Sequence, residues 1–555
     1  MGELRFPGNR PVVVFDPLAS LSREGNPGDD PRCYVLGWMD GDTVPSDGGF
    51  ADRFGRFVAL VHRDRDGVLE VHNDRWGSLP LYYAVTERGV FLSTRAKSLI
   101  EAGAVFPELD LDALAEAMAF DVPLRDHTLL SGMRSLEGGM RLVIDLNGRR
   151  PVEARRMWNP ATALHAERVA FDDVKDELLA TFLEGVAQAT DGIGAVGVTL
   201  SGGMDSRCLL AAALHLGRSV RTYHMSDPGG RADRYARRMA EMYGVPHAAY
   251  AAGPELAQEY YPRLRMSVAR HEGMSFEPET EVSWLRDQVP AASVMLHGGY
   301  AELSKLGDLR RFYLTDRIRR APVASLADLL WPRWQTTFDI RLRAFAPELR
   351  DDLRERARVA FERRIADIAV ADKRLTAEEI VQICYLHEQV KVEKFSGHMW
   401  NQRVATRFPF SYPRYVDLLL RVRPEDRIRQ TFQIHMLHAL APRLYRVPDA
   451  NTGVRVDAPR ALQLFVRAVT KIRRDVLRSR TVGEHADVRG WMGTVTPPPA
   501  DVLLHDLDDR LYDPAGVKQL VAEAGRSWRI GEAFQALLIL ELWRESVGLR
   551  ERLPA

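Results

Sequence analysis

The sequence is poor in cysteine, has no net charge and has no long apolar run. Its three cysteines, Cys33, Cys208 and Cys384, are far apart in 555 residues and form no CxxC pair or Cys/His cluster, which argues against a disulfide framework and a zinc site. Lys plus Arg and Asp plus Glu each number 76, so the net charge gives no reason to expect a nucleic-acid partner. No stretch approaches about 18 uninterrupted apolar residues, and the start, Met1 to Pro7, lacks a leader pattern. We therefore expect a cytoplasmic protein without a membrane segment.

What is present indicates an ordinary globular chain with at least two cores. Hydrophobic residues make up 46% and charged residues 27%, close to the average for soluble proteins. The length is several times that of a typical domain, so two domains are expected.

Residues 11 to about 150 alternate short β-type runs with Gly, Asp and Asn turns, which predicts an antiparallel β-rich domain. A helix from Leu111 to Phe120 is expected within it, capped by Asp110. The predicted strands are Val12–Phe15, Tyr34–Trp38, Phe57–His62, Val68–His72, Leu81–Val85, Val90–Leu92 and Arg141–Asp145.

After Trp158 the pattern changes to longer helices with isolated apolar strands, beginning with the amphipathic stretch Phe171 to Ala189. We therefore predict two domains, residues 1–160 and 161–555. The second opens with a βαβαβ run, which implies a parallel sheet, and continues as a mostly helical part. The expected order is strand Ala195–Leu200, helix Ser206–Leu216, strand Val220–Met225, helix Arg231–Tyr243 and strand His247–Tyr250.

The most specific motif is Ser-Gly-Gly-Met-Asp-Ser at Ser201–Ser206, placed where a strand passes into a helix. Gly202 and Gly203 let the backbone approach phosphates closely, and the helix N-terminus presents amide groups to an anion. Asp205 is expected to bind Mg²⁺. No Gly-Lys-Ser/Thr follows, so the motif is not a Walker A loop.

This motif resembles the PP-loop of the ATP pyrophosphatase superfamily, whose members split ATP into AMP and pyrophosphate. The resemblance implies that Leu200 to Ser206, including Met204, bind the nucleotide, with ATP and Mg²⁺ as cofactors. The end of the next strand, with His224, Met225 and Ser226, is expected to read adenine, and Asp227 and Asp233 follow it. His224 by itself is more often a structural histidine.

Four N-terminal segments are similar to the glutaminase domain of asparagine synthetases: 54–60, 73–84, 92–99 and 128–142. With the PP-loop following, the chain resembles an asparagine synthetase-like protein over nearly its whole length. The resemblance implies a mixed α/β and α+β fold, with an Ntn-type β-sandwich flanked by helices and a PP-loop (HUP-like) parallel-sheet domain with a helical C-terminal part.

A glutaminase of this type needs a Cys as its first mature residue, with the free α-amine as base, whereas this sequence begins Met1-Gly2. Cys33 lies within a strand-like run, where a buried inert thiol is the commoner finding. We expect no glutamine hydrolysis and a structural or substrate-docking N-terminal domain. β-Lactam synthetases and lasso peptide cyclases are relatives without glutaminase activity.

The resemblance also implies a second loop, for which Ala292–Leu303 is the counterpart. Glu302 then takes a catalytic and Mg²⁺-binding position beside Asp205, and Gly298 and Gly299 lie near the nucleotide. The acceptor base has no clear counterpart.

Tyr300 and Glu388 are candidates for that base, or residues that simply pack in the core or face solvent. Arg455, in the loop 448–459, is a candidate electrostatic group where many relatives carry a lysine, although an ordinary loop arginine is equally plausible.

Three functions remain open. The first is an ATP-dependent, AMP-forming carbon–nitrogen ligase that adenylates a carboxylate and joins it to an amine, as in peptide macrocyclisation or β-lactam ring closure. The second is ammonia-dependent amidation of the asparagine synthetase type, and the third is an inactive nucleotide-binding paralogue. The expected partners are a small molecule or peptide with a carboxylate and an amine, and a possible protein that delivers the substrate.

Overall fold

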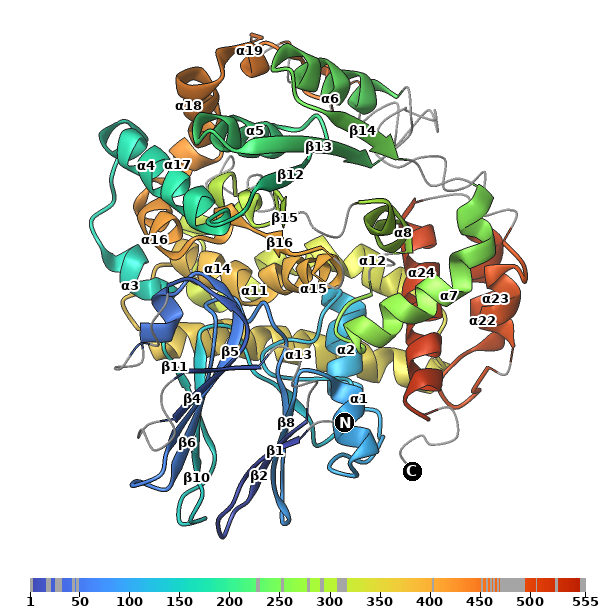
Figure 1. The fold of residues 1–555 in the computed structure, drawn as a ribbon. Helices are drawn as coiled ribbons and strands as arrows, with labels where there is room; N and C mark the ends of the chain where they lie inside the picture. Colours follow the sequence, from blue (N-terminus) through green and yellow to red (C-terminus); the bar gives the residue numbers. More distant parts are fainter. Residues whose placement is uncertain are drawn as a thin grey trace.

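The structure is a computed structural model. It describes residues 3–15, 21–24, 32–41, 45, 49–225, 230–250, 254–276, 280–289, 294–306, 317–401, 404–450, 453–455, 458–459, 462, 465–466, 469, 495–505, 507–524 and 528–549. Figure 1 shows two N-terminal sheets at one end of the molecule and a third sheet at the other, with α14 (Ala377–Cys384) and α15 (Val390–Trp400) between them.

The N-terminal domain is a two-sheet sandwich, as predicted. One sheet has the strand order β1-β2-β8-β7-β9 and the other the order β11-β10-β6-β5-β4-β3. Alternate apolar residues of both sheets meet in one core, among them Val14 and Leu92 from the first and Leu60 and Ile144 from the second. The strands are β1 Glu3–Phe6, β2 Val12–Phe15, β3 Leu21–Glu24, β4 Arg32–Met39, β5 Gly55–Arg63, β6 Val68–Asn73, β7 Tyr82–Thr86, β8 Gly89–Ser93, β9 Arg134–Ser135, β10 Met140–Asp145 and β11 Glu153–Arg156.

Two details of this domain test the local predictions. Helix α2 (Leu111–Phe120) begins where predicted, and the Asp110 carboxylate accepts a hydrogen bond from the Ala113 amide. The sheets are not purely antiparallel, however, because β2 and β8 pair in parallel. Two strands that are distant in sequence can pair in either direction, and turn chemistry does not decide between them.

The second domain is built on a five-stranded sheet in the order β14-β13-β12-β15-β16, in which all the pairs are parallel. Its strands are β12 Ala195–Thr199, β13 Ser219–Met225, β14 His247–Tyr250, β15 Val294–Leu296 and β16 Thr406–Arg407. The chain leaves β12 toward β13 on one side, and β15 later pairs on the other side. Ligands of open α/β sheets bind at such a switch point, outside the carboxyl ends of the strands.

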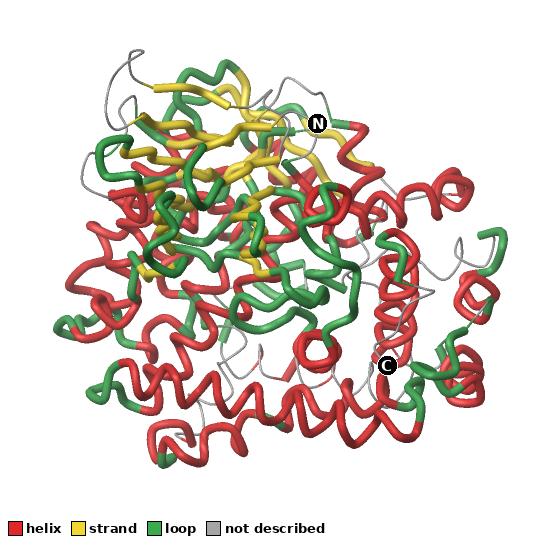
Figure 2. Tube along the Cα trace, turned by 90° about the horizontal axis from the view of Figure 1, so that it is seen from below, coloured by secondary structure: helices red, strands yellow, loops and turns green. Residues whose placement is uncertain are grey.

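Helices cover this sheet and form most of the remaining chain, as Figure 2 shows in red. Helix α4 matches its predicted bounds, whereas α5 begins two residues before Ser206, because the first turn after Gly203 is already helical. The longer helices are α4 Phe171–Ala189, α5 Met204–His215, α6 Arg231–Met242, α7 Pro254–His271, α8 Thr280–Gln288, α12 Pro332–Leu342, α13 Pro347–Ala371, α16 Pro413–Arg421, α18 Thr431–Leu440, α23 Pro514–Glu523 and α24 Trp528–Ser546.

Shorter helical segments complete the described chain: η2 Gly49–Asp52, α1 Ala96–Glu101, α3 Pro160–His165, η3 Ala301–Ser304, α10 Arg317–Arg320, η4 Val323–Ser325, α11 Leu326–Leu330, η5 Tyr385–Gln389, η6 Pro409–Ser411, α17 Pro424–Arg427, α19 Pro442–Tyr445 and α22 Pro499–Leu504. No helix within the described ranges combines the length and the apolar character that a membrane crossing needs.

Candidate active site

The first glycine of the PP-loop is required by the backbone. Gly202 has a φ of +79°, and a Cβ placed on it would lie 2.9 Å from the Cβ of Ala450. Any L-residue there would be strained and would collide with the neighbouring loop. Gly298, in the second loop, faces the same place, because a Cβ on it would lie 3.4 Å from the Cβ of Asp205.

The hydroxyl groups of the loop hold its turn in place. The Gly203 amide donates to Ser201 Oγ at 3.3 Å, and Ser206 Oγ donates to the Gly203 carbonyl at 3.1 Å. Helix α5 then begins at Met204 without a side-chain cap. Its first amides therefore point out of the helix toward the end of β12, where an anion is favoured by the helix dipole.

Two carboxylates meet at one ammonium group beside this loop. Lys305 Nζ lies 2.7 Å from Asp205 Oδ2 and 2.6 Å from Glu302 Oε1. Burial by itself lowers the pKa of Lys305, but the two carboxylates outweigh burial and raise that pKa above its usual range. The predicted pair of acidic residues is therefore brought together in space.

Asp205 is also oriented by an amide. Gln433 Nε2 donates to Asp205 Oδ1 at 3.2 Å and to Ser304 Oγ at 2.5 Å. Sequence reasoning missed both Lys305 and Gln433. The only signal for Lys305 is its place three residues after Glu302, on one short helical turn, and Gln433 comes from the distant helix α18.

The residues present fit a magnesium ion bound together with phosphates. In the described part of the chain no three His, Cys, Asp or Glu residues gather to hold a metal, yet Asp205 and Glu302 converge on a single cation position. Mg²⁺ is commonly held by one or two carboxylates and the phosphates of its substrate. Asp205 and Glu302 would hold the ion, and it would neutralise charge on the phosphates.

A buried arginine fixes the loop that faces the PP-loop. Arg207, on α5, is inaccessible to solvent, and its guanidinium donates to the carbonyls of Gly202 at 2.7 Å, Val447 at 2.5 Å and Pro448 at 2.6 Å. The Ala450 amide donates to the Gly202 carbonyl at 3.3 Å. Arg207 therefore positions the backbone of two loops that lie far apart in the sequence.

The end of β13 lies beside the end of β12, where the PP-loop begins. His224 is buried, its Nδ1 lies 2.8 Å from the carbonyl of Leu200, and its Nε2 has no partner among the described residues. Nδ1 therefore carries a proton, which it donates to the carbonyl. Met225 pairs through its backbone with Tyr250 in β14.

The three residues predicted to follow the nucleotide-binding strand are only partly described. Ser226 and Asp227 lie outside the described residues. Asp233 is buried on α6, 3.7 Å from Nε2 of His247.

Tyr300 is not placed to act as a base. Its buried ring packs against Trp76 and Phe408, with centroids 5.2 and 5.6 Å away. Burial raises the pKa of its hydroxyl above the usual range, so the phenolate is disfavoured. Gly299 also faces protein rather than the PP-loop, since a Cβ on it would lie 2.8 Å from Glu393 Oε2.

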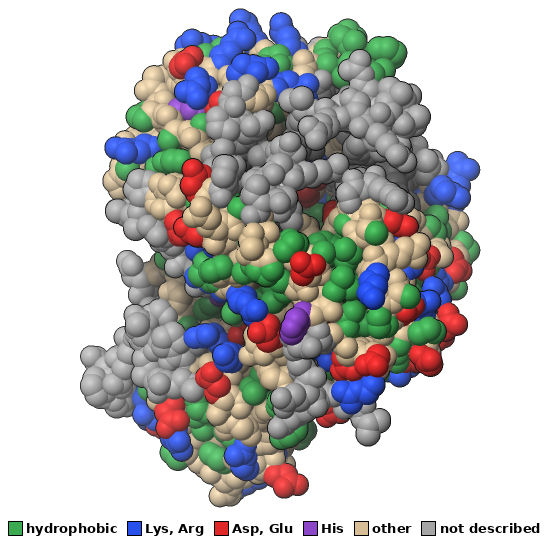
Figure 3. All heavy atoms as spheres, turned by 90° about the vertical axis from the view of Figure 1, so that its right-hand side faces the viewer, with side chains coloured by type: hydrophobic (Ala, Val, Ile, Leu, Met, Phe, Trp, Pro, Cys, Tyr) green, Lys and Arg blue, Asp and Glu red, His purple; other side chains and the backbone are tan. Residues whose placement is uncertain are grey.

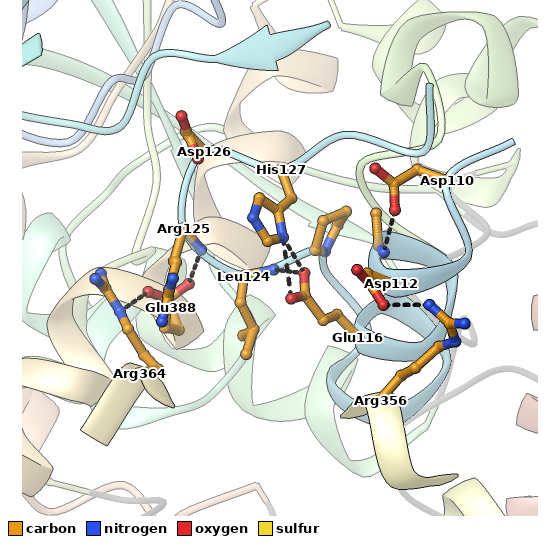
Figure 4. A network of polar contacts seen from close by, with 12 residues as sticks. Asp110, Asp112, Glu116, Leu124, Arg125, Asp126, His127, Arg356, Arg364 and Glu388 are labelled. Atoms are coloured by element: carbon orange, nitrogen blue, oxygen red, sulfur yellow. Dashed lines mark hydrogen bonds and ion pairs between the residues drawn. The ribbon is translucent and has the colours of Figure 1, made fainter. Parts of the chain in front are cut away.

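Glu388 is not a free base either. Its Oε1 lies 2.5 Å from Arg364 Nε, and its Oε2 lies 2.8 Å from Lys391 Nζ and accepts from the Arg125 amide (Figure 4). Burial raises the pKa of Glu388, but these cations outweigh burial and lower it. Arg455 is exposed on the loop after α19.

The comparisons with known proteins agree with this geometry. A family model described as asparagine synthase matches residues 177–543, two thirds of the chain. The chain belongs to the asparagine synthase family. A second model, for a glutamine amidotransferase domain, matches residues 49–158 of this asparagine synthase-family chain.

A curated relative is similar over a shorter stretch. It is asparagine synthetase [glutamine-hydrolyzing] 1 of Bacillus subtilis (strain 168), which is 25% identical over 212 residues. The match covers 38% of this chain and 33% of the relative.

Proposed function

We propose that the chain is an ATP-dependent carbon–nitrogen ligase that activates a substrate carboxylate as an acyl-adenylate, releases pyrophosphate and joins the acyl group to an amine. The observation that carries this proposal is the convergence of Asp205 and Glu302 on one cation position beside the PP-loop. The family match supports ATP-dependent amidation in general.

The proposed chemistry assigns a task to each part of the site. The amides at the start of α5 bind phosphate oxygens, and the two carboxylates hold Mg²⁺. Attack by the substrate carboxylate oxygen on the α-phosphorus breaks the bond to pyrophosphate. The amine then attacks the acyl carbon, AMP leaves, and the amine gives up a proton.

The nitrogen is proposed to come from an amine on the substrate or from free ammonia. All three cysteines are buried, and burial raises the pKa of Cys208 well above its usual value and that of Cys384 to about 12. A buried neutral thiol is a poor nucleophile. Ring closure within one substrate, as in a peptide macrocycle or a β-lactam, therefore fits better than glutamine hydrolysis.

Exchange of radioactive pyrophosphate into ATP tests the adenylation step. Asp205→Asn removes one carboxylate charge and keeps the shape and the contact with Gln433. Since a single electrostatic group in an active site contributes about 3 kcal/mol, exchange should fall roughly 100-fold. Exchange at the wild-type rate in a folded Asp205→Asn protein would contradict the assignment, and Asp172→Asn on the exposed face of α4 is the matched control.

Ammonia-dependent asparagine synthesis is the second candidate, and the similarity to the Bacillus subtilis synthetase favours it. Aspartate-dependent pyrophosphate exchange, with asparagine formed on addition of ammonium, would identify this reaction. Exchange that depends on a substrate carrying its own amine would support the first candidate.

A further inference from the structure

A cavity lies between the N-terminal domain and helix α15. Turns and strand ends of the sandwich form one wall, and the segment from η5 to α15 forms the other. Small-molecule sites favour such domain interfaces. The lining residues are Arg75, Trp76, Arg125, Ser135, Leu136, Glu137, Gly138, Arg156, Trp158, Met274, Leu386, His387, Val390, Lys391, Lys394 and Phe395.

Most of the charges of this lining are paired. Five cationic side chains line the cavity, and Glu137 is the one carboxylate among the lining residues. Four of the cations are ion-paired: Arg75 with Asp417, Arg125 with Asp367, Arg156 with Glu137 and Lys391 with Glu388, which lies between Arg125 and Arg364 (Figure 4). The charge left without an ion pair among the described residues is therefore that of Lys394.

Lys394 is the lining cation that has no ion pair among the described residues. Its side chain is 4% exposed, and its ammonium lies over the ring of Phe395, 5.3 Å from the ring centre, with no hydrogen bond to any residue that the structure describes. His387 and Lys391 precede it by seven and three residues, on the same helical face. Both ring nitrogens of His387 lack a partner within the described ranges.

Such an arrangement is unfavourable when empty. Burial, with Lys391 beside it, lowers the pKa of Lys394 to about 8, against the smaller opposite effects of Asp74 and Glu137. A buried charge without a counter-ion costs several kcal/mol, and an entering anion removes that cost. Positive lining alone would suit any anion, but Trp76, Trp158 and Phe395 add apolar and aromatic surface.

We propose that this cavity binds a small organic anion, a carboxylate on an apolar body, with Lys394 contacting the carboxylate. The ring of Trp76 lines the cavity on one side and packs against Tyr300 of the second loop on the other. The cavity is thus connected to the second loop through the Trp76–Tyr300 contact. Its use as a subsite for the ligase substrate rests on the proposed function, whereas binding of the anion does not.

Calorimetric titration without nucleotide tests the proposal, with benzoate as probe and benzamide as its neutral isostere. Wild-type protein should bind one benzoate per chain and benzamide at least tenfold more weakly. Lys394→Met should weaken benzoate binding at least tenfold, and Lys394→Arg should retain most of it. Lys175→Met, an exposed lysine paired with Asp172 on α4, is the matched control and should bind as wild type does.

Thermal melting separates loss of binding from loss of folding. Because an unpaired buried charge is removed, unliganded Lys394→Met should melt at or above the wild-type temperature, and benzoate should raise the melting temperature of wild type only. Equal benzoate binding by wild type and Lys394→Met, no binding by either, or tighter binding of inorganic phosphate than of benzoate would overturn the proposal. Since pyrophosphate exchange is a separate measurement, its failure would count against the ligase function alone.

Discussion

Replacing Lys305 with Met should make the protein more dependent on Mg²⁺ for its stability. The Lys305 ammonium lies 2.7 and 2.6 Å from oxygens of Asp205 and Glu302, so those oxygens are at most about 5.3 Å apart (2.7 plus 2.6). Without the lysine, two like charges remain at this separation.

The magnitude follows from Coulomb's law. At about 5 Å and an effective dielectric constant of 20, the repulsion is roughly 3 kcal/mol. The Glu302 side chain is 42% exposed, so solvent screening brings the loss nearer to about 1 kcal/mol. For the roughly 370 residues of the matched domain, this lowers the melting temperature by about 1–4 °C.

The assay is differential scanning fluorimetry with and without Mg²⁺ and a non-hydrolysable ATP analogue. In wild type the ion must displace an ammonium from the two carboxylates, whereas in Lys305→Met it meets them free. The stabilisation by Mg²⁺ should therefore be larger in the variant. Equal Mg²⁺-dependent shifts in wild type and variant would refute the shared cation position, and Lys175→Met controls for loss of an exposed lysine.

Four further results are expected. Glu302→Gln should slow pyrophosphate exchange by about two orders of magnitude, and a higher Mg²⁺ concentration should restore part of the rate. Unchanged kinetics would show that Ala292–Leu303 is not the counterpart of the family's second loop. Arg207→Met should cost about 3 kcal/mol in denaturant unfolding, because it leaves buried carbonyls without donors, and ATP binding should weaken with it. Glutamine should give no glutamate, and small alkylating reagents should scarcely change turnover with an amine; glutamate release lost on Cys33→Ala would contradict this. Burial lowers the pKa of His271 to about 4. As the pH falls below about 6.5, the unfolded state therefore binds a proton before the folded state does, and the free energy of unfolding decreases between about pH 6.5 and 4. His271→Phe should remove up to about 2 kcal/mol of the decrease in the free energy of unfolding between pH 7 and pH 5.

Local patterns in the sequence predicted most of the framework around the site. The run from Ala195 to Tyr250 forms the expected parallel strands and helices, because period and turn residues act within a few positions. The Ser201–Ser206 motif lies at the end of the central strand for the same reason. The predicted antiparallel pairing is wrong for β2 and β8, because the direction in which two strands pair depends on contacts between distant segments.

The chemistry of the site depended on those distant contacts. Asp205 and Glu302 could be predicted from the sequence. Only the folded chain places Lys305 between them and brings Gln433 from α18 to orient the carboxylate of Asp205. In the sequence alone, nothing distinguishes Tyr300 or Glu388 from a residue that could act as the acceptor base. Their surroundings, an aromatic wall and a set of buried ion pairs, come from the other domain as well as their own, and these decide that neither is a free base.

The cavity beside α15 also depends on the folded chain. In the sequence, Lys394 is an ordinary helix lysine, and its neighbours give no sign that it lies in a cavity. Its lack of a counter-ion arises only when α15 packs against the sandwich and water is excluded from both. Charge and periodicity are properties of the chain, whereas desolvation and pairing are properties of the packed structure, because both depend on which distant surfaces meet.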